Sequence, residues 1–212
     1  MSNSREKILS KIRQALTTRV PVPFVSTNAD KEIFEAEKDD LELKFAENFS
    51  QLQGRFVYCG SVEELVANLN ELAAVRKWDN IYCVEDALKE SLQNNGFSNL
   101  SSNDLKSCDA SITTCEALVA RTGSILLSSA EQSGRTVSVY APVHICIAYT
   151  SQLVFDIKDG LQLLKTKYKG NLPSLISLAT GPSRTADIEK TLVVGVHGPK
   201  EVFCFLIENH KY

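Results

Sequence analysis

The sequence predicts an α/β fold in which helices flank a central, mainly parallel sheet. Between Arg55 and Gly96, short apolar runs alternate with helical patterns, which is the order of elements in β-α-β crossovers. The runs are apolar throughout, and this is typical of strands that are buried on both faces. With 43% hydrophobic and 23% charged residues, the 212-residue chain has the composition of a globular domain, which excludes wholesale disorder.

The first 25 residues are predicted to form an arm with a proline-containing linker. Ser4 is a suitable N-cap for a narrow amphipathic helix that ends near Thr17. The apolar side chains of this helix share one face and are Ile8, Leu9, Ile12 and Leu16. Pro21 and Pro23 then favour extended backbone. Residues 26–212 are expected to fold as a single α/β domain. The arm is expected to dock either on this domain or on another subunit.

The elements of the domain follow from apolar periodicity and from turn residues. The expected strands cover residues 56–59, 81–84, 111–114, 117–120, 124–127, 137–140, 145–149, 175–179, 191–196 and 202–207. The expected helices cover residues 30–49, 61–74, 85–94 and 156–168. Ser61 and Glu64 fit a capping box at the second of these helices, and Gly123 supplies a tight turn between two strands.

Charge and cysteine usage exclude several classes of function. The net charge is −3 and Lys and Arg do not cluster, so neither nucleic acid nor acidic lipid is an expected partner. No apolar run has the length of a signal peptide or membrane span, which predicts a cytoplasmic protein. The six cysteines are scattered singly through strand-like runs without C-x2-C spacing, so we expect reduced core residues and neither a metal nor an iron–sulfur cluster in this chain.

The most informative segment runs from Thr180 to Glu189 and reads as a strand end, a Gly-Pro turn and a short helix that starts near Thr185. Ligands bind at the carboxyl ends of sheet strands, and a helix N-terminus there offers unpaired N–H groups to a carboxylate or phosphate. The candidate ligand-binding residues in this segment are Thr180, Gly181, Ser183, Arg184 and Thr185. In the alternative interpretation, Ser183 or Thr185 caps the helix and Asp187 opposes its dipole.

Two histidines are candidate catalytic groups, together with Asp187. His197 stands at a strand end before a Gly-Pro turn, and His144 begins another strand. An imidazole with an unperturbed pKa of about 6.5 can act as a general base or an oxyanion donor near neutrality. The alternative for His197 is a turn residue that bonds nearby backbone. Thr122 and Gly123 form a further candidate ligand-binding segment.

One further pattern indicates a structural role, and several well-known catalytic motifs are absent. Glu131 and Arg135 are expected to form a surface ion pair. The sequence contains neither a nucleophile elbow nor a phosphate-binding loop, dinucleotide fingerprint or zinc-protease motif, so ordinary hydrolase and kinase chemistry is not supported.

Residues Thr180–Glu189 and Gly195–Pro199 resemble the LUD-domain family, specifically its lactate-utilisation protein C group. Ala120–Ser124 is similar to the family's A-E-T-G-T segment and Pro142–Ile145 to its P-x-H-I segment, although Arg121 stands where the family more often has an acidic residue. The resemblance implies a fold similar to the ribose-phosphate isomerase and CoA-transferase superfamily, with a central mixed sheet. It also implies work with two iron–sulfur partner proteins that oxidise L-lactate to pyruvate, with the clusters on those partners and no cofactor in this chain.

Two classes of function compete. In the first, the chain is an accessory subunit of a lactate-oxidising complex that binds a small organic acid. In the second, it is a stand-alone enzyme or binder of a small phosphorylated or carboxylated metabolite. A purely structural module is a third reading. Whether the chain catalyses a step, and whether it forms a homo-oligomer, stays open at this point.

Overall fold

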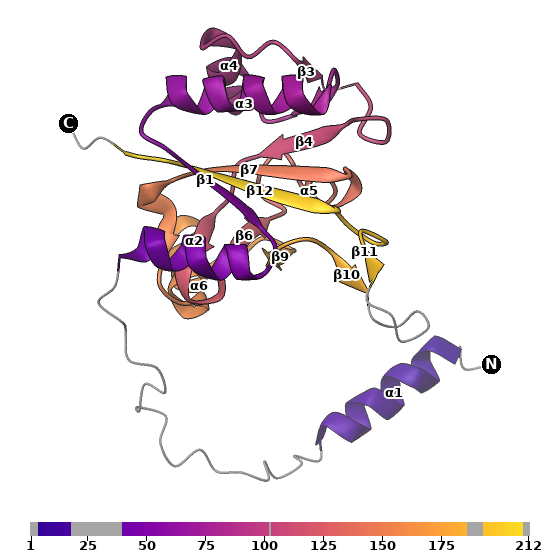
Figure 1. Ribbon diagram of the computed structural model, residues 1–212. Helices are drawn as coiled ribbons and strands as arrows, with labels where there is room; N and C mark the ends of the chain where they lie inside the picture. Colours follow the sequence, from indigo (N-terminus) through magenta and orange to yellow (C-terminus); the bar gives the residue numbers. More distant parts are fainter. Residues whose placement is uncertain (1–3, 18–39, 102, 186–192, 210–212) are drawn as a thin grey trace. The chain divides into compact units, whose positions relative to one another are not determined.

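The computed structural model describes residues 4–17, 40–101, 103–185 and 193–209 (Figure 1). The chain divides into two compact units, Met1–Glu37 and Lys38–Tyr212. In the first unit, α1 (Ser4–Thr17) matches the helix expected there. The linker that follows it, and the start of the helix expected from residue 30, lie outside the described residues. Within the described residues, α2 (Leu41–Gln51) matches the end of that expected helix and begins directly after Asp40, which caps it.

A six-stranded sheet, parallel throughout, forms the centre of the second unit. Its strands, in spatial order, are β1 (Arg55–Cys59), β12 (Glu201–Ile207), β7 (Val143–Tyr149), β4 (Ala110–Thr113), β2 (Ile81–Tyr82) and β3 (Leu100–Ser101). The C-terminal strand β12 is therefore inserted between β1 and β7. This sheet and its flanking helices confirm the predicted α/β fold.

Helices α3 (Val62–Arg76) and α4 (Asp86–Asn94) cover one face of this sheet. The helix α3 begins as the sequence indicates, because Ser61 Oγ accepts from the Glu64 N–H and the Glu64 carboxylate accepts from the Gly60 N–H. Successive residues of β12 point to opposite faces. Phe203 and Phe205 pack toward the helices, whereas Cys204 packs into the core on the other side.

The second face is covered by α2 and by a smaller mixed sheet. The strands of the small sheet, in order, are β8 (Leu153–Val154), β5 (Ala117–Val119), β6 (Ser124–Ser128) and β9 (Ile176–Ala179). Its own far face packs against α6 (Ile157–Lys167) through a cluster that includes Leu126 and Leu164. The short 3-10 helix η1 (Ala120–Thr122) connects β5 to β6, and η2 (Thr150–Gln152) connects β7 of the large sheet to β8. The small sheet and the amino ends of β7 and β12 together position the candidate site.

Two expected elements differ from the structure. Residues 137–140, expected as a strand from their valines, form the short helix α5 (Val137–Tyr140). Because β4 and β7 pair directly with each other, no strand position is left for this segment, and Ser111 Oγ instead bonds the Val137 carbonyl. The helix expected from Thr185 is also wrong at its start, because β10 (Arg184–Thr185) pairs antiparallel with β11 (Val193–Val194).

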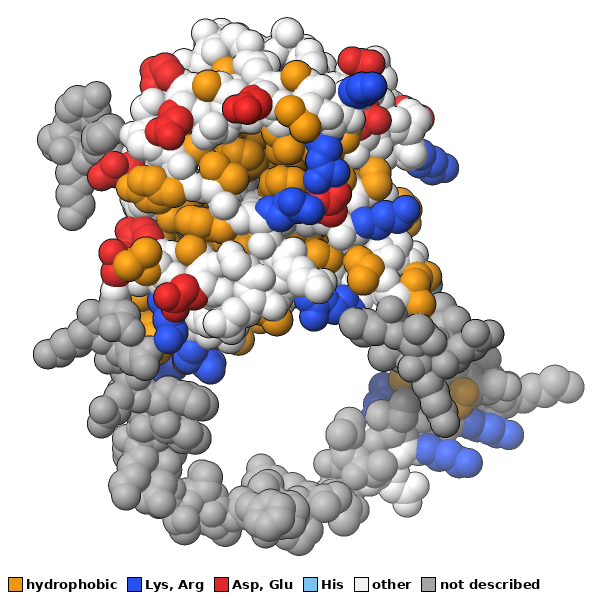
Figure 2. Space-filling model, in the orientation of Figure 1, with side chains coloured by type: hydrophobic (Ala, Val, Ile, Leu, Met, Phe, Trp, Pro, Cys, Tyr) orange, Lys and Arg blue, Asp and Glu red, His pale blue; other side chains and the backbone are white. Residues whose placement is uncertain are grey.

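An apolar band crosses the surface at the edge strand β1 (Figure 2). Among the described residues, β12 is the only strand that pairs with β1. Between β1 and α3 lies a groove of about 280 Å³ lined mainly by apolar side chains, namely Val57, Leu72, Val75, Phe203 and Phe205, with Asn68 and Glu71. Val75 is 72% exposed. Within the described ranges, no helix is long and apolar enough to cross a membrane.

Candidate functional site

Two adjoining cavities lie where the small sheet meets the amino ends of β7 and β12. The inner cavity, of about 280 Å³, is bounded by His144 and Val202 from the large sheet, by Leu127 and residues 177–180 from the small sheet, by α5, and by the turns at 181–183 and 197–199. The outer cavity, of about 660 Å³, is lined by Lys106 and Lys200 among others. Val139, His197 and Gly198 line both cavities. His144 and His197, which are 53 positions apart, therefore border the same space.

The inner cavity lies at the opposite edge of the large sheet from the one that the rule of carboxyl ends predicts. Thr180 does follow the carboxyl end of β9, but β9 belongs to the small sheet, where it runs antiparallel to β6. In the large sheet, His144 and Val202 are register partners, each at the second position of its strand. The carboxyl end of β9 in the small sheet therefore lies beside the amino ends of β7 and β12 in the large sheet, and this places the cavity at the unexpected edge.

A group of hydroxyls joins two of the candidate ligand-binding residues. Ser124 Oγ lies 2.8 Å from Thr122 Oγ1 and 2.9 Å from Thr180 Oγ1. Thr180 lines the inner cavity, whereas Thr122 reaches it only through Ser124. Ser124 adjoins the predicted segment at Thr122 and Gly123, but its contact with Thr180 spans 56 positions and was not predicted.

Gly123, Gly181 and Arg184 contact the C-terminal part of α2. Both glycines have a positive φ, 58° at Gly123 and 81° at Gly181. A Cβ at Gly123 would collide with the backbone at Phe49, and one at Gly181 would collide with the Leu52 carbonyl oxygen. Arg184 Nη2 donates to that same carbonyl at 2.6 Å. Gly181 still borders the inner cavity, but Gly123 and Arg184 serve the packing of α2.

Ser183 and Thr185 are held in strand-like backbone instead of opening a helix. The Ser183 N–H donates to the Pro199 carbonyl, and the Gly195 N–H donates to the Ser183 carbonyl, both at 2.9 Å. Thr185 pairs with Val193. The helix N-terminus expected to bind an anion is therefore not formed here, although Ser183 lines the inner cavity. Asp187 lies outside the described residues.

His144 is fully buried and has one defined hydrogen bond. Its Nε2 lies 2.9 Å from Thr113 Oγ1, and Thr113 Oγ1 donates to the Thr114 carbonyl at 2.8 Å. Its Nδ1 is buried without a partner among the described residues. Burial lowers the pKa of His144 to about 4, so the ring is neutral at pH 7. His197 is exposed and reaches both cavities.

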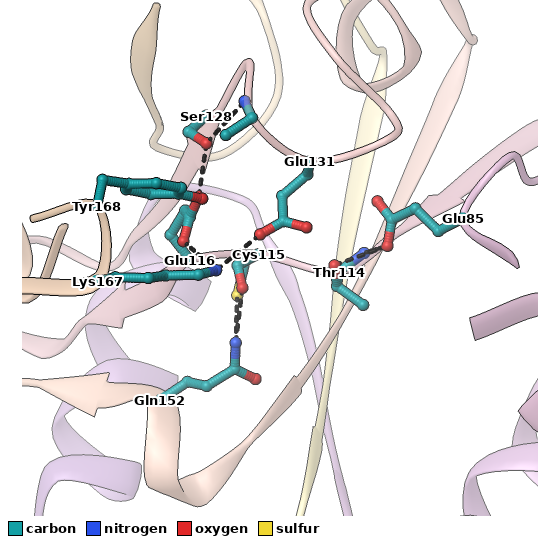
Figure 3. A network of polar contacts seen from close by, with 10 residues as sticks. Glu85, Thr114, Cys115, Glu116, Ser128, Glu131, Gln152, Lys167 and Tyr168 are labelled. Atoms are coloured by element: carbon teal, nitrogen blue, oxygen red, sulfur yellow. Dashed lines mark hydrogen bonds and ion pairs between the residues drawn. The ribbon is translucent and has the colours of Figure 1, made fainter. Parts of the chain in front are cut away.

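A buried carboxylate, that of Glu85, lies at the carboxyl edge of the large sheet (Figure 3). Glu85 follows β2, and its Oε2 accepts from the Thr114 N–H at 2.9 Å and from Thr114 Oγ1 at 2.6 Å. Its Oε1 is buried and has no partner among the described residues. Because Thr113 and Thr114 are neighbours, His144 and Glu85 are the two ends of one polar connection through β4.

Glu116 forms a saturated network beside it (Figure 3). Its carboxylate accepts from Ser128 Oγ at 2.5 Å, Tyr168 OH at 2.7 Å and Lys167 Nζ at 2.8 Å. Burial opposes the charge, yet these three donors hold the pKa of Glu116 below its ordinary value. Both carboxylate oxygens have partners within the protein, so we assign Glu116 a structural role.

The same network corrects the expected ion pair between Glu131 and Arg135. Glu131 instead bonds Lys167 Nζ at 2.9 Å, and Arg135 donates to Ser174 Oγ. A local spacing of four residues suggested the first pair, whereas the structure uses α6, which is distant in sequence.

The six cysteines are all free and buried, as the sequence indicates. Contact with the Cys146 thiol and burial raise the pKa of Cys115 well above its ordinary value, and Cys146 shows a shift in the same direction. Such thiols are unreactive core groups. Within the described residues, no cluster of His, Cys, Asp and Glu is suited to hold a metal ion.

Comparison with known proteins identifies the family. A model of the LUD domain matches residues 43–207. Lactate utilization protein C from Bacillus subtilis strain 168 is 35% identical over 100 residues, which cover 46% of this chain and 42% of that protein. The protein of the same name from Shouchella clausii is 35% identical over 122 residues, 57% of this chain and 53% of that protein. An uncharacterized protein of Neisseria meningitidis serogroup B is 35% identical over 99 residues, 47% and 42% of the two chains.

The alignments with these relatives cover only part of each protein. The chain matches about half the length of these curated relatives. A crystal structure of a DUF162 family protein from Deinococcus radiodurans has a TM-score of 0.58 and 18% sequence identity, covering 79% of this chain and 96% of that one. This similarity shows that the two proteins share the fold.

Proposed function

Because the chain belongs to the LUD domain family, we propose that it works in lactate utilisation, as an accessory component of a cytoplasmic, multi-subunit iron–sulfur system that oxidises L-lactate to pyruvate. Several relatives carry the name lactate utilization protein C, which supports this role. In this proposal the iron–sulfur clusters reside on partner proteins, and this chain contributes a site for a small organic acid.

The observation that carries the proposal is the shared cavity of His144 and His197. A volume of about 280 Å³ suits a small acid, and Ser138, Thr180 and Ser183 give its wall hydroxyl groups that can bond one. The outer cavity is lined by Lys106 and Lys200, which bring positive charge to it. A ligand whose carboxylate lies at the junction near His197 is attracted by this positive charge, while its remaining atoms face His144.

The groove at β1 supplies a surface on which an iron–sulfur partner can dock. Most of its residues are apolar, they flank the edge strand β1, and Val75 in the groove is highly exposed. Apolar surface of this kind marks protein interaction sites. We assign the groove to a partner subunit of the complex.

One observation favours the second candidate function. The outer cavity, at about 660 Å³, is larger than a three-carbon acid fills, and its lysines suit a phosphate group. A stand-alone enzyme or binder that acts on a phosphorylated metabolite would use this space.

The deciding experiment measures lactate-dependent dye reduction by this chain alone, by its two iron–sulfur partners, and by all three proteins together. Activity that needs the full mixture supports the accessory role. Full activity of the two partners without this chain rejects it, and calorimetric titration of the isolated chain with phosphorylated acids then tests the second candidate.

A matched pair of variants tests the docking groove in the same assay. Val75→Glu places a charge in the groove, whereas Leu161→Glu places one on an exposed position of α6. We expect Val75→Glu to lower the reconstituted activity at least about tenfold, equal to 1.4 kcal/mol of association free energy, and Leu161→Glu to leave it unchanged. Equal effects of the two variants would reject the groove as the docking surface.

A further inference from the structure

We infer that the inner cavity selects 2-hydroxy acids over the corresponding 2-oxo acids, because His144 Nδ1 accepts a hydrogen bond that only the hydroxyl of a hydroxy acid can donate. The inference rests on the proposed binding of a small acid in this cavity. It adds the class of acid and the residue that discriminates it.

The hydrogen bonds of Thr113 determine which ring nitrogen of His144 carries the proton. A threonine hydroxyl has one proton. Thr113 Oγ1 donates it to the Thr114 carbonyl oxygen, 2.8 Å away, which can only accept. Toward His144 Nε2, 2.9 Å away, Thr113 Oγ1 therefore acts as acceptor. The ring proton lies on Nε2, and Nδ1 presents a lone pair.

Burial keeps His144 in that state. The ring is fully buried and its pKa is lowered to about 4, so at neutral pH it holds a single proton, the one on Nε2. Nδ1 has no donor among the described residues. A buried acceptor without a partner is unfavourable, and a donor brought by a ligand relieves this cost.

The remaining polar side chains of the cavity do not show the same preference. Ser138, Ser177 and Ser183 carry hydroxyls, which can donate or accept as the ligand requires. The imidazole of His197, which also lines the cavity, can present either a donor or an acceptor nitrogen. Thr180 Oγ1 is already engaged with Ser124. His144 is thus the group in the described wall whose hydrogen-bonding role is fixed.

The chemistry of the two acids then decides the preference. The 2-hydroxyl of lactate has a proton to donate to Nδ1, while the 2-carbonyl of pyruvate offers only lone pairs, which repel that of Nδ1. A site built to bond a hydroxyl rejects the analogue that lacks it, since its buried group is left unpaired. The cavity consequently holds the reduced acid and releases the oxidised one.

Thr113 acts in this scheme as a positioning residue. Thr113→Val removes the acceptor from Nε2 while keeping the shape of the side chain, so the proton can move to Nδ1. The ring then donates into the cavity and can bond the carbonyl of an oxo acid. Thr113→Ser retains the hydroxyl and is the matched control.

The experiment is calorimetric titration of the full chain with L-lactate, pyruvate and propionate, in the wild type, Thr113→Val, Thr113→Ser and His144→Phe. For the wild type and Thr113→Ser we expect lactate to bind at least about tenfold more tightly than pyruvate or propionate. Thr113→Val should bring the lactate-to-pyruvate ratio near one or below it. His144→Phe should bind lactate and propionate alike. Nitrogen NMR of the three histidines reports the Nε2–H tautomer directly.

The outcomes separate this inference from the function on which it rests. Equal affinity of the wild type for lactate and pyruvate overturns the selection but leaves small-acid binding intact. Failure of the wild type to bind any of the three acids overturns both. An unchanged ratio in a folded Thr113→Val variant, or a proton found on Nδ1 in the wild type, overturns the role given to Thr113. The wild-type measurements decide the selection even where a variant does not fold.

Discussion

Replacing Glu116 by glutamine tests whether this carboxylate holds α6 onto the small sheet. Glu116→Gln keeps the side-chain shape and one oxygen, which can still accept from Ser128 and Tyr168. The other oxygen becomes an NH2 group that faces Lys167 Nζ, so two donors meet where a charged pair was 2.8 Å apart.

The magnitude follows from the burial of the two partners. The Glu116 side chain is 0% exposed, but that of Lys167 is 48% exposed and recovers water when its partner is lost. A hydrogen bond to a charged group contributes about 1.5–3 kcal/mol, and breaking a fully buried pair costs about 3–5 kcal/mol. With one half-exposed partner, we expect Glu116→Gln to lower the free energy of unfolding by about 2 kcal/mol and the melting temperature by about 4–8 °C.

Urea unfolding followed by tryptophan fluorescence measures the change. Trp78 is the single tryptophan, is 8% exposed, and belongs to the core between the large sheet and its helices, away from Glu116. Glu131→Gln is the matched control, because Glu131 bonds the same lysine from a more exposed position and should cost under about 1 kcal/mol. A loss below about 0.5 kcal/mol for Glu116→Gln, or equal losses for both variants, would refute this reasoning.

Two further predictions concern the segment around η1. Gly123→Ala should lower the free energy of unfolding by at least about 2 kcal/mol in urea unfolding, since a Cβ at a φ of 58° is strained and meets the α2 backbone; unchanged stability would contradict the close approach. Asp156 accepts two bonds from Arg121, which lower the pKa of that carboxyl below its unfolded value. The resulting stability is present above the unfolded pKa, near 4, and is lost as the pH falls through the lower folded pKa. The difference in unfolding free energy between wild type and Arg121→Gln should therefore shrink from pH 5 to pH 2.5, and a difference that grows on acidification would contradict it.

The sequence predicted five of the six strands of the large sheet because their signal is local, whereas the two-residue strand β3 was missed. Strands such as β12 are apolar along their whole length, and helices such as α3 carry their own cap at Ser61. The strand predicted for residues 137–140 was wrong. The valines of this segment favour a strand where a neighbouring strand edge is free, and the pairing between β4 and β7 leaves no such edge. Which edge is free is a property of the assembled sheet.

The candidate site was predicted only in part for the same reason. Gly-Pro turns and histidines at strand ends marked residues such as His197, Thr180 and Ser183, and all three border the inner cavity. Their neighbours in space were not predictable, because the register of β12 against β7 brings them together over more than fifty positions. The tautomer that we infer for His144 was not predictable from the sequence either, since it depends on Thr113 in a third strand.

The position of His144 in the sheet is informative about its purpose. The residues that share its face of β7 and β12 are apolar or thiols, including Cys146, Val202 and Cys204. An apolar side chain would suit this core better, because a neutral imidazole forms no ion pair here and leaves a buried acceptor unsatisfied, at a cost of about 1–3 kcal/mol. Glu85 Oε1, at the far end of the same polar connection, carries a second unsatisfied atom. Packing does not account for either group, whereas a ligand that brings a donor to the cavity wall accounts for His144.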